Sequence, residues 1–529
     1  MQLFGDGSGN VDTPDSARAV TPRTSMPVPV ELLLVLAAAF TLRLAVYFLL
    51  PNIVYPDEIF QVTEPAHRLA FGTGLMSWEW HVGIRSWLLP GALSALMWLG
   101  GLMGDAPWLV NLPIALFMAA AACVPVACAW GWGRAVSGRA GGFVAAGCCA
   151  VWIDLVYMSN HTLTEVVAAN FMVLGLYLGY AGEGAAVSRR RLFWSGVMLG
   201  MAVVLRFHLS PALAVAALGI CGVTRGWKPW AAFMGGAAIP VALAAVLDWA
   251  TLGLPLQSIW LNFWLNVVVG VSKGAGVSPF ATLLLVPLQI WGLAGFLLVA
   301  AAVALGTRRL PLLLAVALTI FLVHSFIAHK EYRFIYPAIV LLAVLAGVGT
   351  SRIVQRVLEG RVLPRGGRAA LAGGLVLAWS ALSLSIGASD VFSIPWTRGR
   401  SYMEVFDAAS RDRTICGVGV YGMYWTETGG QTWLPRDVRL YDATAESLPK
   451  QSAAYNAIIT RQGVTVPDPS YRKLACFAGD RAADGTALRG DCLWKRPGRC
   501  DAGAAPEPGP IWDNFEAARR YLLEHRRTP

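Results

Sequence analysis

The chain has 529 residues, of which 56% are hydrophobic and only 14% are charged. Soluble globular domains carry about a quarter charged residues, so this balance excludes an ordinary soluble domain and indicates a protein that spans a membrane many times. The formal net charge of +10 does not indicate a nucleic-acid-binding protein, because the arginines stand in short clusters between apolar runs. Such clusters are typical of loops that meet an anionic inner leaflet.

Apolar runs of about 20 residues, each long enough to cross a bilayer as a helix, recur between residues 28 and 387. Residues 1–27 are polar and predict a cytoplasmic N-terminal tail without a cleavable signal peptide. We predict a polytopic α-helical membrane protein with about 11–12 spans. The candidates are 28–50, 86–104, 107–130, 141–158, 163–181, 192–205, 209–224, 230–250, 280–304, 309–327, 334–349 and 368–387.

Basic clusters predict which ends of the spans face the cytoplasm. These clusters are Arg18/Arg23, Arg134/Arg139, Arg189–Arg191, Arg225/Lys228, Arg308/Arg309 and the arginines from Arg352 to Arg368. If all are cytoplasmic, the loops on the opposite face are 51–85, 159–165, 206–208, 261–279 and 328–337. Residues 86–130 must then cross an odd number of times but contain two candidate spans. Either one of them is re-entrant or Arg134/Arg139 breaks the rule.

The first external loop, 51–85, holds the densest cluster of ionisable residues. Pro56, Asp57 and Glu58 predict a helix start, because proline and carboxylates suit the first turn. Helical spacing predicts an apolar face made of Ile59, Val62, Ala66 and Leu69. The same spacing predicts one polar stripe made of Asp57, Gln61, Glu64 and Arg68. We expect a helix along the membrane surface with carboxylates facing a cavity. The alternative is an acidic pair that only starts a helix.

The stretch "AHKEYRFIYP" (328–337) is the second dense cluster. Its basic residues could be interfacial anchors that snorkel towards water. However, an excess of basic residues is unexpected on the non-cytoplasmic face, and an anionic ligand such as a lipid phosphate would account for His329, Lys330 and Arg333. Arg206 and His208, between two short apolar segments, favour the same interpretation.

Other motifs are weaker or absent. The cluster around His161 and Glu165 could in part be a helix cap. The sequence contains no P-loop, dinucleotide fingerprint, G-x-S-x-G or H-E-x-x-H motif, so it gives no support to ATP, nicotinamide, serine-hydrolase or zinc-protease chemistry. No cofactor is firmly implied. A divalent metal is possible but unsupported, with Asp57, Glu58 and Glu64 as its candidate ligands.

From residue 388 the sequence becomes more polar and contains strand-like runs such as "TICGVGVYG" and "DCLWKRP". We predict that residues 388–529 form a small mixed α/β domain on the non-cytoplasmic side. This region contains Cys416, Cys476, Cys492 and Cys500, and an oxidising compartment would favour disulfides between them. A hairpin could pair Cys476 with Cys492 and leave the other two as a pair, but four cysteines allow three connectivities.

Two of these segments together resemble a known family. "PDEIFQVTEPAHRLAFGTGLMSWEW" (56–80) and "HKEYRFIYPAI" (329–339) are similar to motifs of the Alg9-like mannosyltransferase family, glycosyltransferase family 22. The segments 162–165 and 262–280 look like further family segments, and the resemblance covers roughly residues 30–345. It implies a transmembrane glycosyltransferase of the GT-C fold over residues 28–387.

The resemblance also implies a reaction. Family members take a sugar, usually mannose, from a polyprenyl- or dolichyl-phosphate donor with inversion at the anomeric carbon. The acceptor would be a lipid-linked or cell-envelope glycan. Carried over by motif, Asp57 and its neighbour Glu58 would be the catalytic pair, with His329, Lys330, Glu331 and Arg333 near the lipid phosphate. We add Arg206 to the phosphate group. Residues expected to line the cavity or bind the acceptor are Gln61, Glu64, His67, Arg68, Glu165 and Glu331.

Two other functions remain open at this point. A transporter or flippase of lipid-linked sugars would also have many spans, but it favours inverted repeats and broken helices near the bilayer midplane, whereas these clusters lie in loops on one face. A non-catalytic membrane subunit would use the C-terminal region to bind a partner. For the enzyme, we expect a bacterial plasma membrane with the site outside the cytoplasm, or the endoplasmic reticulum membrane in a eukaryote.

Overall fold

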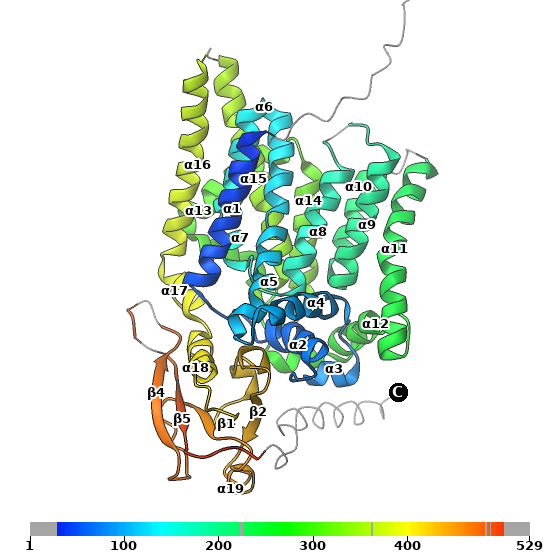
Figure 1. The fold of residues 1–529 in the computed structure, drawn as a ribbon. Helices are drawn as coiled ribbons and strands as arrows, with labels where there is room; N and C mark the ends of the chain where they lie inside the picture. Colours follow the sequence, from blue (N-terminus) through cyan, green and yellow to red (C-terminus); the bar gives the residue numbers. More distant parts are fainter. Residues whose placement is uncertain are drawn as a thin grey trace, which may run out of the picture.

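The computed structural model describes residues 29–182, 185–222, 226–360, 363–481, 484–486 and 488–501. The predicted tail 1–27 and residues 502–529 of the predicted C-terminal domain lie outside these ranges. Figure 1 shows a bundle of helices with a small sheet at one end. The predicted class, a polytopic helical membrane protein with a mixed C-terminal region, is confirmed.

Six helical stretches among the described residues are long and apolar enough to cross a membrane. They are α1 (Val30–Leu49), α5 joined to α6 (Pro107–Val151), α11 (Trp227–Leu252), α13 (Thr282–Thr307), α15 (Tyr332–Gly360) and α16 (Arg365–Gly387). Shorter helices complete the bundle: α8 (Thr164–Gly179), α9 (Arg189–Leu205), α10 (Ser210–Cys221) and α14 (Pro311–Phe326). Several of the predicted spans are therefore too short to cross as straight, full-length helices.

Helix α15 lies at the centre of the bundle and is almost wholly buried. Its close contact with α13 depends on glycine. A Cβ added to Gly349 would lie 1.8 Å from the carbonyl oxygen of Ala302, and one added to Gly306 would lie 2.0 Å from that of Leu345. Small residues allow two backbones to approach in this way, which is the usual source of helix association in a membrane.

Residues 86–158 correct the predicted spans. Helix α6 (Val124–Val151) reverses direction at Ser137 and Gly138, where the backbone leaves the helical region. Arg139, just after the reversal, lies 3.6 Å from Glu31 at the start of α1, so both belong to the predicted cytoplasmic end. Helix α4 (Leu88–Met103) does not cross: it packs beside the first external loop at the opposite end (Figure 1). This arrangement favours a single crossing by the segment 86–130, with Arg134/Arg139 at the end that the charge rule predicts to be cytoplasmic.

The first external loop contains a π-helix, Glu58–Thr63, followed by α2 (Glu64–Phe71) and α3 (Trp78–Val82). The expected helix is present, but its first turn is wider because the amide of Glu64 bonds back to the carbonyl of Ile59, five residues earlier. This turn shifts the phase of the later residues. The predicted single polar stripe is therefore wrong. Ala66 of the predicted apolar face is 0% exposed, as expected for a packed face; the position of this helix at the membrane surface stays a prediction.

The sheet has five strands in the order β2-β1-β3-β5-β4. Their bounds are β1 Gly417–Tyr421, β2 Arg439–Ala443, β3 Ala457–Arg461, β4 Arg472–Ala478 and β5 Gly490–Lys495. Strands β2, β1 and β3 are parallel, whereas β5 is antiparallel to both β3 and β4. The chain enters the sheet through α17 (Asp390–Thr397) and α18 (Arg400–Arg411), and the short α19 (Leu448–Gln451) precedes β3.

One face of the sheet has an apolar cluster of its own around Tyr455, whereas the core of the other face is shared with the first external loop. Ile59 and Phe60 of the π-helix share one buried apolar cluster with Phe406 of α18 and Val418 of β1. The first external loop thus completes the core of the sheet. This packing fixes one side of the loop and leaves the other side facing the helices.

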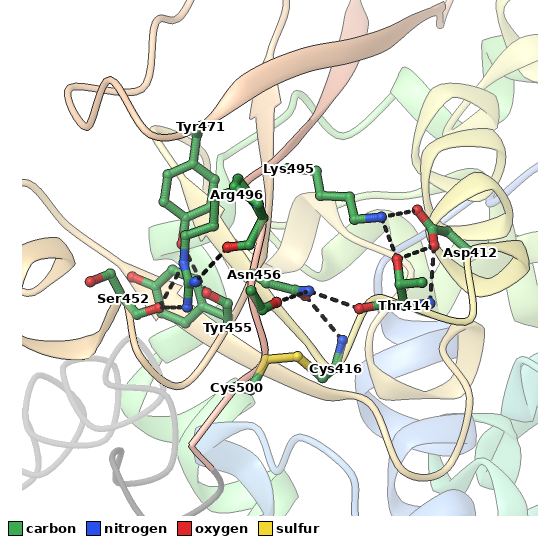
Figure 2. The surroundings of a disulfide bond; sticks show 12 residues. Asp412, Thr414, Cys416, Ser452, Tyr455, Asn456, Tyr471, Lys495, Arg496 and Cys500 are labelled. Atoms are coloured by element: carbon green, nitrogen blue, oxygen red, sulfur yellow. Dashed lines mark hydrogen bonds and ion pairs between the residues drawn. A yellow bond between two sulfur atoms is a disulfide. The ribbon is translucent and has the colours of Figure 1, made fainter.

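Two disulfides stabilise the sheet region. Cys476 on β4 and Cys492 on β5 are direct cross-strand neighbours and are bonded. The second disulfide joins Cys416, just before β1, to Cys500 near the end of the described chain. Figure 2 shows Asn456 beside this bond; it accepts a hydrogen bond from the Cys416 amide at 3.0 Å and donates to the Thr414 carbonyl at 2.8 Å.

Candidate active site

A cavity of about 690 Å³ lies where the first external loop meets the ends of several helices. Its walls come from four of the loops that the charge rule assigned to the non-cytoplasmic face: 51–85, 206–208, 261–279 and 328–337. The lining includes Asp57, Gln61, Arg206, His329, Glu331 and Arg333 of the residues named from the sequence. Folding thus brings the acidic and the basic motifs together, although they lie more than 250 residues apart.

An ion pair between the two motifs forms the centre of the site. Arg333, in the first turn of α15, donates a hydrogen bond from Nη2 to Oδ2 of Asp57. Asp57 stands at the start of the π-helix, where the positive end of the helix dipole favours a carboxylate. Its side chain is 29% exposed, while that of Arg333 is 8% exposed. The acidic partner is therefore open to a ligand and the guanidinium is held in the wall.

Arg333 also belongs to a longer chain of charges. It donates from Nε to Glu331, and the same nitrogen lies 3.7 Å from Glu165. Arg206 lies 3.1 Å from the same Glu165 oxygen. The ring of Phe334 lies between the two guanidiniums, 5.0 Å from that of Arg206 and 5.2 Å from that of Arg333. These contacts stabilise two neighbouring cations in a buried wall, where the carboxylates and the aromatic ring replace the water that would otherwise surround them.

The protonation of Asp57 follows from these neighbours. Burial alone would raise its pKa, but the nearby guanidiniums of Arg333, Arg85 and Arg206 lower it below its ordinary value of 3.8. The carboxylate is therefore ionised at neutral pH. An ionised carboxylate beside an open cavity is the form that a general base requires.

A second group of lining residues was not named as part of the site from the sequence. Glu79 accepts hydrogen bonds from Arg85 at 2.7 Å, Gln61 at 3.0 Å and Ser77 at 2.8 Å. This network holds Gln61 and Arg85 at the edge of the cavity. A signal was available, because Arg85 is a cation in a loop on the non-cytoplasmic face, where arginine is unexpected.

Amide side chains from another part of the chain complete the lining. Asn262 belongs to α12 (Gln257–Phe263), and Asn266 to the π-helix Trp264–Val269 that follows. Asn266 donates to Asn262 at 2.9 Å, and Asn262 donates to the Ile84 carbonyl at 3.2 Å. No sequence signal separates these amides from ordinary helix residues.

The structure places Glu58 away from this cavity, although it follows Asp57 directly. Its carboxylate accepts from the backbone amides of Val54 at 2.7 Å and Tyr55 at 3.3 Å, and from His161 Nδ1 at 2.8 Å. Thr162 donates to its backbone carbonyl at 3.1 Å. Glu58 therefore fixes the turn that carries Asp57 and does not line this cavity; its expected role as the second member of a catalytic pair stays a prediction.

Glu64 also points away from the cavity, because the π-helical turn rotates it to the far side. It is fully buried and accepts from the amide of Leu75 at 2.6 Å and from the amide and hydroxyl of Thr432 at 2.7 and 2.5 Å. Thr432 lies in the short helical turn Gln431–Trp433 of the sheet region. Glu64 is thus a link between the first external loop and the sheet, not a cavity-lining residue.

Three more residues do not line the cavity. His67 donates to the Thr73 carbonyl at 2.5 Å, and Arg68 donates to the Gly74 carbonyl at 3.1 Å. Both bonds close the turn after α2, which ends at Gly72 with a φ of 79°. Lys330 donates to the carbonyls of Ile327 at 2.5 Å and Ser278 at 3.1 Å, so its ammonium is held by the backbone.

The three carboxylates considered as metal ligands have different partners: Asp57 pairs with Arg333, Glu58 with His161 and Glu64 with Thr432. They point in different directions and do not form a joint ligand set. Within the described ranges of the chain, no group of three or more histidine, cysteine, aspartate or glutamate side chains is arranged to hold a metal ion.

The chain is similar to known membrane enzymes. It is 27% identical over 434 residues to the GPI mannosyltransferase 3 of Yarrowia lipolytica, which covers 78% of this chain and 77% of that protein. It is 25% identical over 341 residues to the GPI alpha-1,2-mannosyltransferase 3 of Mus musculus, covering 59% and 58%. The structure of ArnT from Cupriavidus metallidurans in the apo state superposes with a TM-score of 0.51 at 15% identity, covering 90% of this chain and 99% of that one.

The likeness to ArnT concerns the fold alone, which is that of GT-C glycosyltransferases. The family is shown by a different comparison: residues 33–431 match the model of the Alg9-like mannosyltransferase family. This range contains both motifs that meet in the cavity and ends at the turn that Glu64 holds. The chain is therefore a multi-pass membrane glycosyltransferase, and it belongs to the Alg9-like mannosyltransferase family.

Proposed function

We propose that the enzyme transfers mannose from a polyprenyl-phosphate donor to a hydroxyl of a lipid-linked or cell-envelope glycan, with inversion at the anomeric carbon. One observation carries the proposal: the ionised Asp57 and the guanidiniums of Arg333, Arg206 and Arg85 line the same cavity. Such a transfer needs a base at one end and cations for a departing phosphate at the other.

In the proposed reaction, Asp57 accepts the proton of the acceptor hydroxyl as its oxygen attacks the anomeric carbon. The bond between that carbon and the phosphate oxygen breaks, and the electron pair leaves with the lipid phosphate. Arg333 and Arg206 stabilise this negative charge, because a guanidinium binds phosphate through charge-assisted hydrogen bonds. His329 also lines the cavity, with its Nε2 3.1 Å from Glu331 and its Nδ1 3.2 Å from the Gly276 carbonyl, so it would bind the same phosphate by exchanging one of these partners.

The ion pair between Asp57 and Arg333 gives this reaction an order. In the free enzyme the guanidinium holds the carboxylate and lowers its pKa, which makes Asp57 a weak base. A donor phosphate competes for Arg333 as a second anion. When it binds, Asp57 loses its strongest partner and its pKa rises. The base thus becomes effective only when the donor is in place.

The membrane face of the reaction follows from the disulfides. The sheet with its two disulfides lies at the same end of the helices as α2 and α3 of the first external loop (Figure 1), and this loop contributes Asp57 and Gln61 to the cavity. Disulfides form in oxidising compartments. We therefore assign the site to the lumen of the endoplasmic reticulum in a eukaryote, or to the outer face of the plasma membrane in a bacterium. The relatives named as GPI mannosyltransferases support a lipid-anchored glycan as acceptor.

The test is transfer of labelled mannose from synthetic polyprenyl-phosphate mannose to extracted membrane glycolipids by the purified protein. The proposal predicts a mannosylated lipid and free polyprenyl phosphate in equal amounts. Polyprenyl-phosphate glucose, presented in parallel, tests the sugar. Movement of intact donor across a vesicle membrane without cleavage would instead identify a flippase and contradict the proposal.

A further inference from the structure

A second cavity, of about 340 Å³, lies on the other side of the peptide that joins Asp57 to Glu58. Asp57 lines the first cavity and Glu58 the second, and the described residues that line the two cavities do not overlap. The second cavity is enclosed by the end of α1, the first part of α5, the turn between α7 (Ile153–Met158) and α8, helix α18 and the Gln431–Trp433 turn. The proposed reaction gives this second cavity no role.

Three asparagines in its wall have the same orientation. The amide nitrogen of Asn52 donates to the Leu50 carbonyl at 2.8 Å, and that of Asn160 donates to the Arg43 carbonyl at 2.8 Å. The nitrogen of Asn111 donates to the Pro107 carbonyl at 2.9 Å. Because a carbonyl can only accept, these bonds fix which end of each side chain is nitrogen. Asn52 and Asn160 each use one N–H donor in this way, whereas Asn111 also donates to the Thr432 carbonyl at 3.3 Å.

The oxygens of Asn52 and Asn160 are buried and have no hydrogen-bond partner. Buried polar atoms are nearly always paired, so an unpaired acceptor beside a cavity indicates a ligand that supplies donors. Two further acceptors line the cavity, the carboxylates of Glu404 and Asp407 on α18. Each already has an arginine partner, Arg400 at 2.8 Å and Arg411 at 2.7 Å, and keeps acceptor capacity.

The same cavity is poorly suited to a phosphate. Arg411 is the one arginine or lysine among its described lining residues, and it is paired with Asp407. His161 is paired with Glu58. An anion would meet acceptors and carboxylates on most sides. The cavity therefore differs in kind from the first one, in which three guanidiniums face the open space.

The mouth of the cavity lies at a lipid-facing edge. Phe48 on α1 and Trp108 on α5 line it and are 52% and 51% exposed. Both helices belong to the membrane-spanning stretches. An apolar chain could lie along them while a polar head group enters the cavity. The aromatic ring of Trp433 in the wall offers a flat face of the kind that sugar rings pack against.

We propose that this second cavity binds the sugar head group of a lipid-linked glycan through the hydroxyls of that head group. The inference rests on the proposed function and adds a place for its acceptor. The lipid chain would lie against α1 and α5, the sugars nearest the lipid would bind Asn52, Asn160 and α18, and the distal sugar would extend towards Asp57. Donor and acceptor would thus approach Asp57 from opposite sides.

The probe for the test is tritiated dodecyl α-mannoside, with the protein purified in octaethylene glycol dodecyl ether. This detergent has the same alkyl chain, its ether oxygens accept but do not donate, and its single hydroxyl stands at the far end of the head group, so it competes chiefly for the hydrocarbon part. We expect saturable binding of the mannoside above this background. Asn52→Leu, of similar volume, should weaken binding about three- to tenfold, and Asn52→Leu with Asn160→Leu more than tenfold.

Two control variants make the result specific. Asn52→Gln keeps both the amide donor and the acceptor oxygen and should retain mannoside binding better than Asn52→Leu, which also checks that a change at this position is compatible with folding. Arg333→Gln, in the first cavity, should leave mannoside binding unchanged. Unchanged binding in the double leucine variant, or equal loss in Arg333→Gln, would overturn the assignment, as would displacement of the mannoside by polyprenyl phosphate in the Arg333→Gln protein.

The binding assay does not depend on transfer, so the two proposals can fail separately. If Asp57→Asn binds the mannoside but transfers no sugar, both hold. If the mannoside binds as expected while Asp57→Asn remains active, the second cavity stands and the proposed base is wrong. If Asp57→Asn is inactive but the leucine variants bind normally, the acceptor site lies elsewhere and the proposed function is unaffected.

Discussion

The two sides of the first external loop show what a buried carboxylate can be used for. Asp57 and Glu64 lie seven residues apart on one continuous helical segment, yet their partners differ. Asp57 faces guanidiniums in an open cavity. Glu64 is fully buried and is held by two backbone amides and a hydroxyl. A charged partner can be exchanged for a ligand, whereas the amide bonds of Glu64 are part of the fold.

The comparison teaches that the loop has one chemical side and one structural side. Its apolar residues complete the core of the sheet, and Glu64 ties it to Thr432. Glu58 also has a structural role, because it fixes the turn that carries Asp57 through its bond to His161. Asp57 is thus the one carboxylate of the segment 57–64 that remains available for chemistry. The following predictions test this division, from the largest expected effect to the smallest.

Asp57→Asn should be close to inactive. Asparagine keeps the shape and can still accept a hydrogen bond, but it cannot take a proton. Loss of a general base costs about 10²–10⁴-fold in rate. The measurement is turnover of polyprenyl-phosphate mannose by purified protein. Asp412→Asn serves as the matched control, since this carboxylate pairs with Lys495 (Figure 2) and is not among the residues that line either cavity. It should retain activity.

Arg333→Gln should weaken use of the donor by about ten- to a hundredfold, because a charge-assisted contact to phosphate contributes about 1.5–3 kcal/mol. The loss should appear in kcat/KM for the donor at limiting donor concentration. Lys330→Gln is the control, since the ammonium of Lys330 is held by two backbone carbonyls. An equal loss in both variants would mean that the phosphate contacts lie along the whole 329–333 motif.

Glu64→Ala should lower stability without changing the chemistry of the cavity. It leaves the amides of Leu75 and Thr432 buried without an acceptor, and each such group costs about 1–3 kcal/mol. We expect a lower thermal midpoint and faster proteolysis of the sheet region. Glu64→Gln keeps an acceptor oxygen and should be milder. If Glu64→Gln were folded, stable and inactive, the structural role of this side would be wrong.

The pH dependence of activity should shift with the ion pair. The pKa of Asp57 is lowered in the free enzyme, so its ionised form is present at neutral pH and is lost only as the pH falls through that lowered value. The acid limb of kcat/KM should therefore lie at a lower pH than the ordinary titration of an aspartate would give. Arg333→Gln removes a cation that lowers this pKa, so the limb should move to higher pH. If the acid limb of Arg333→Gln stayed at the wild-type pH, the limb would not report the ionisation of Asp57.

Some of this account was predictable from the sequence. The charge rule predicted that Asp57, Arg206 and Arg333 share one face of the membrane, and the structure brings them to one cavity. Charge and hydropathy are local properties of the chain, so this much could be predicted from them; that the face is the non-cytoplasmic one stays a prediction. The family and the fold class followed from the same residues.

Other features were not predictable, for two physical reasons. The π-helical turn at 58–63 rotates every later residue of the segment about the helix axis. No residue type or spacing in the sequence predicts such a turn. This is why Glu64 was assigned to the wrong side. The contact between Glu64 and Thr432 joins residues 368 positions apart. One face of the sheet packs against apolar residues that the first external loop contributes. Such long-range packing has no sequence periodicity.

In the proposed reaction Arg333 pairs with Asp57 in the free enzyme and with the donor phosphate once the donor has bound. The most direct test is the affinity of the purified protein for polyprenyl phosphate, measured for wild type, Asp57→Asn and Arg333→Gln. Because Asp57→Asn frees the guanidinium from its ion pair, this inactive variant should bind polyprenyl phosphate at least as tightly as wild type, while Arg333→Gln should bind it more weakly. Weaker binding by Asp57→Asn, together with unchanged binding by Arg333→Gln, would contradict the claim.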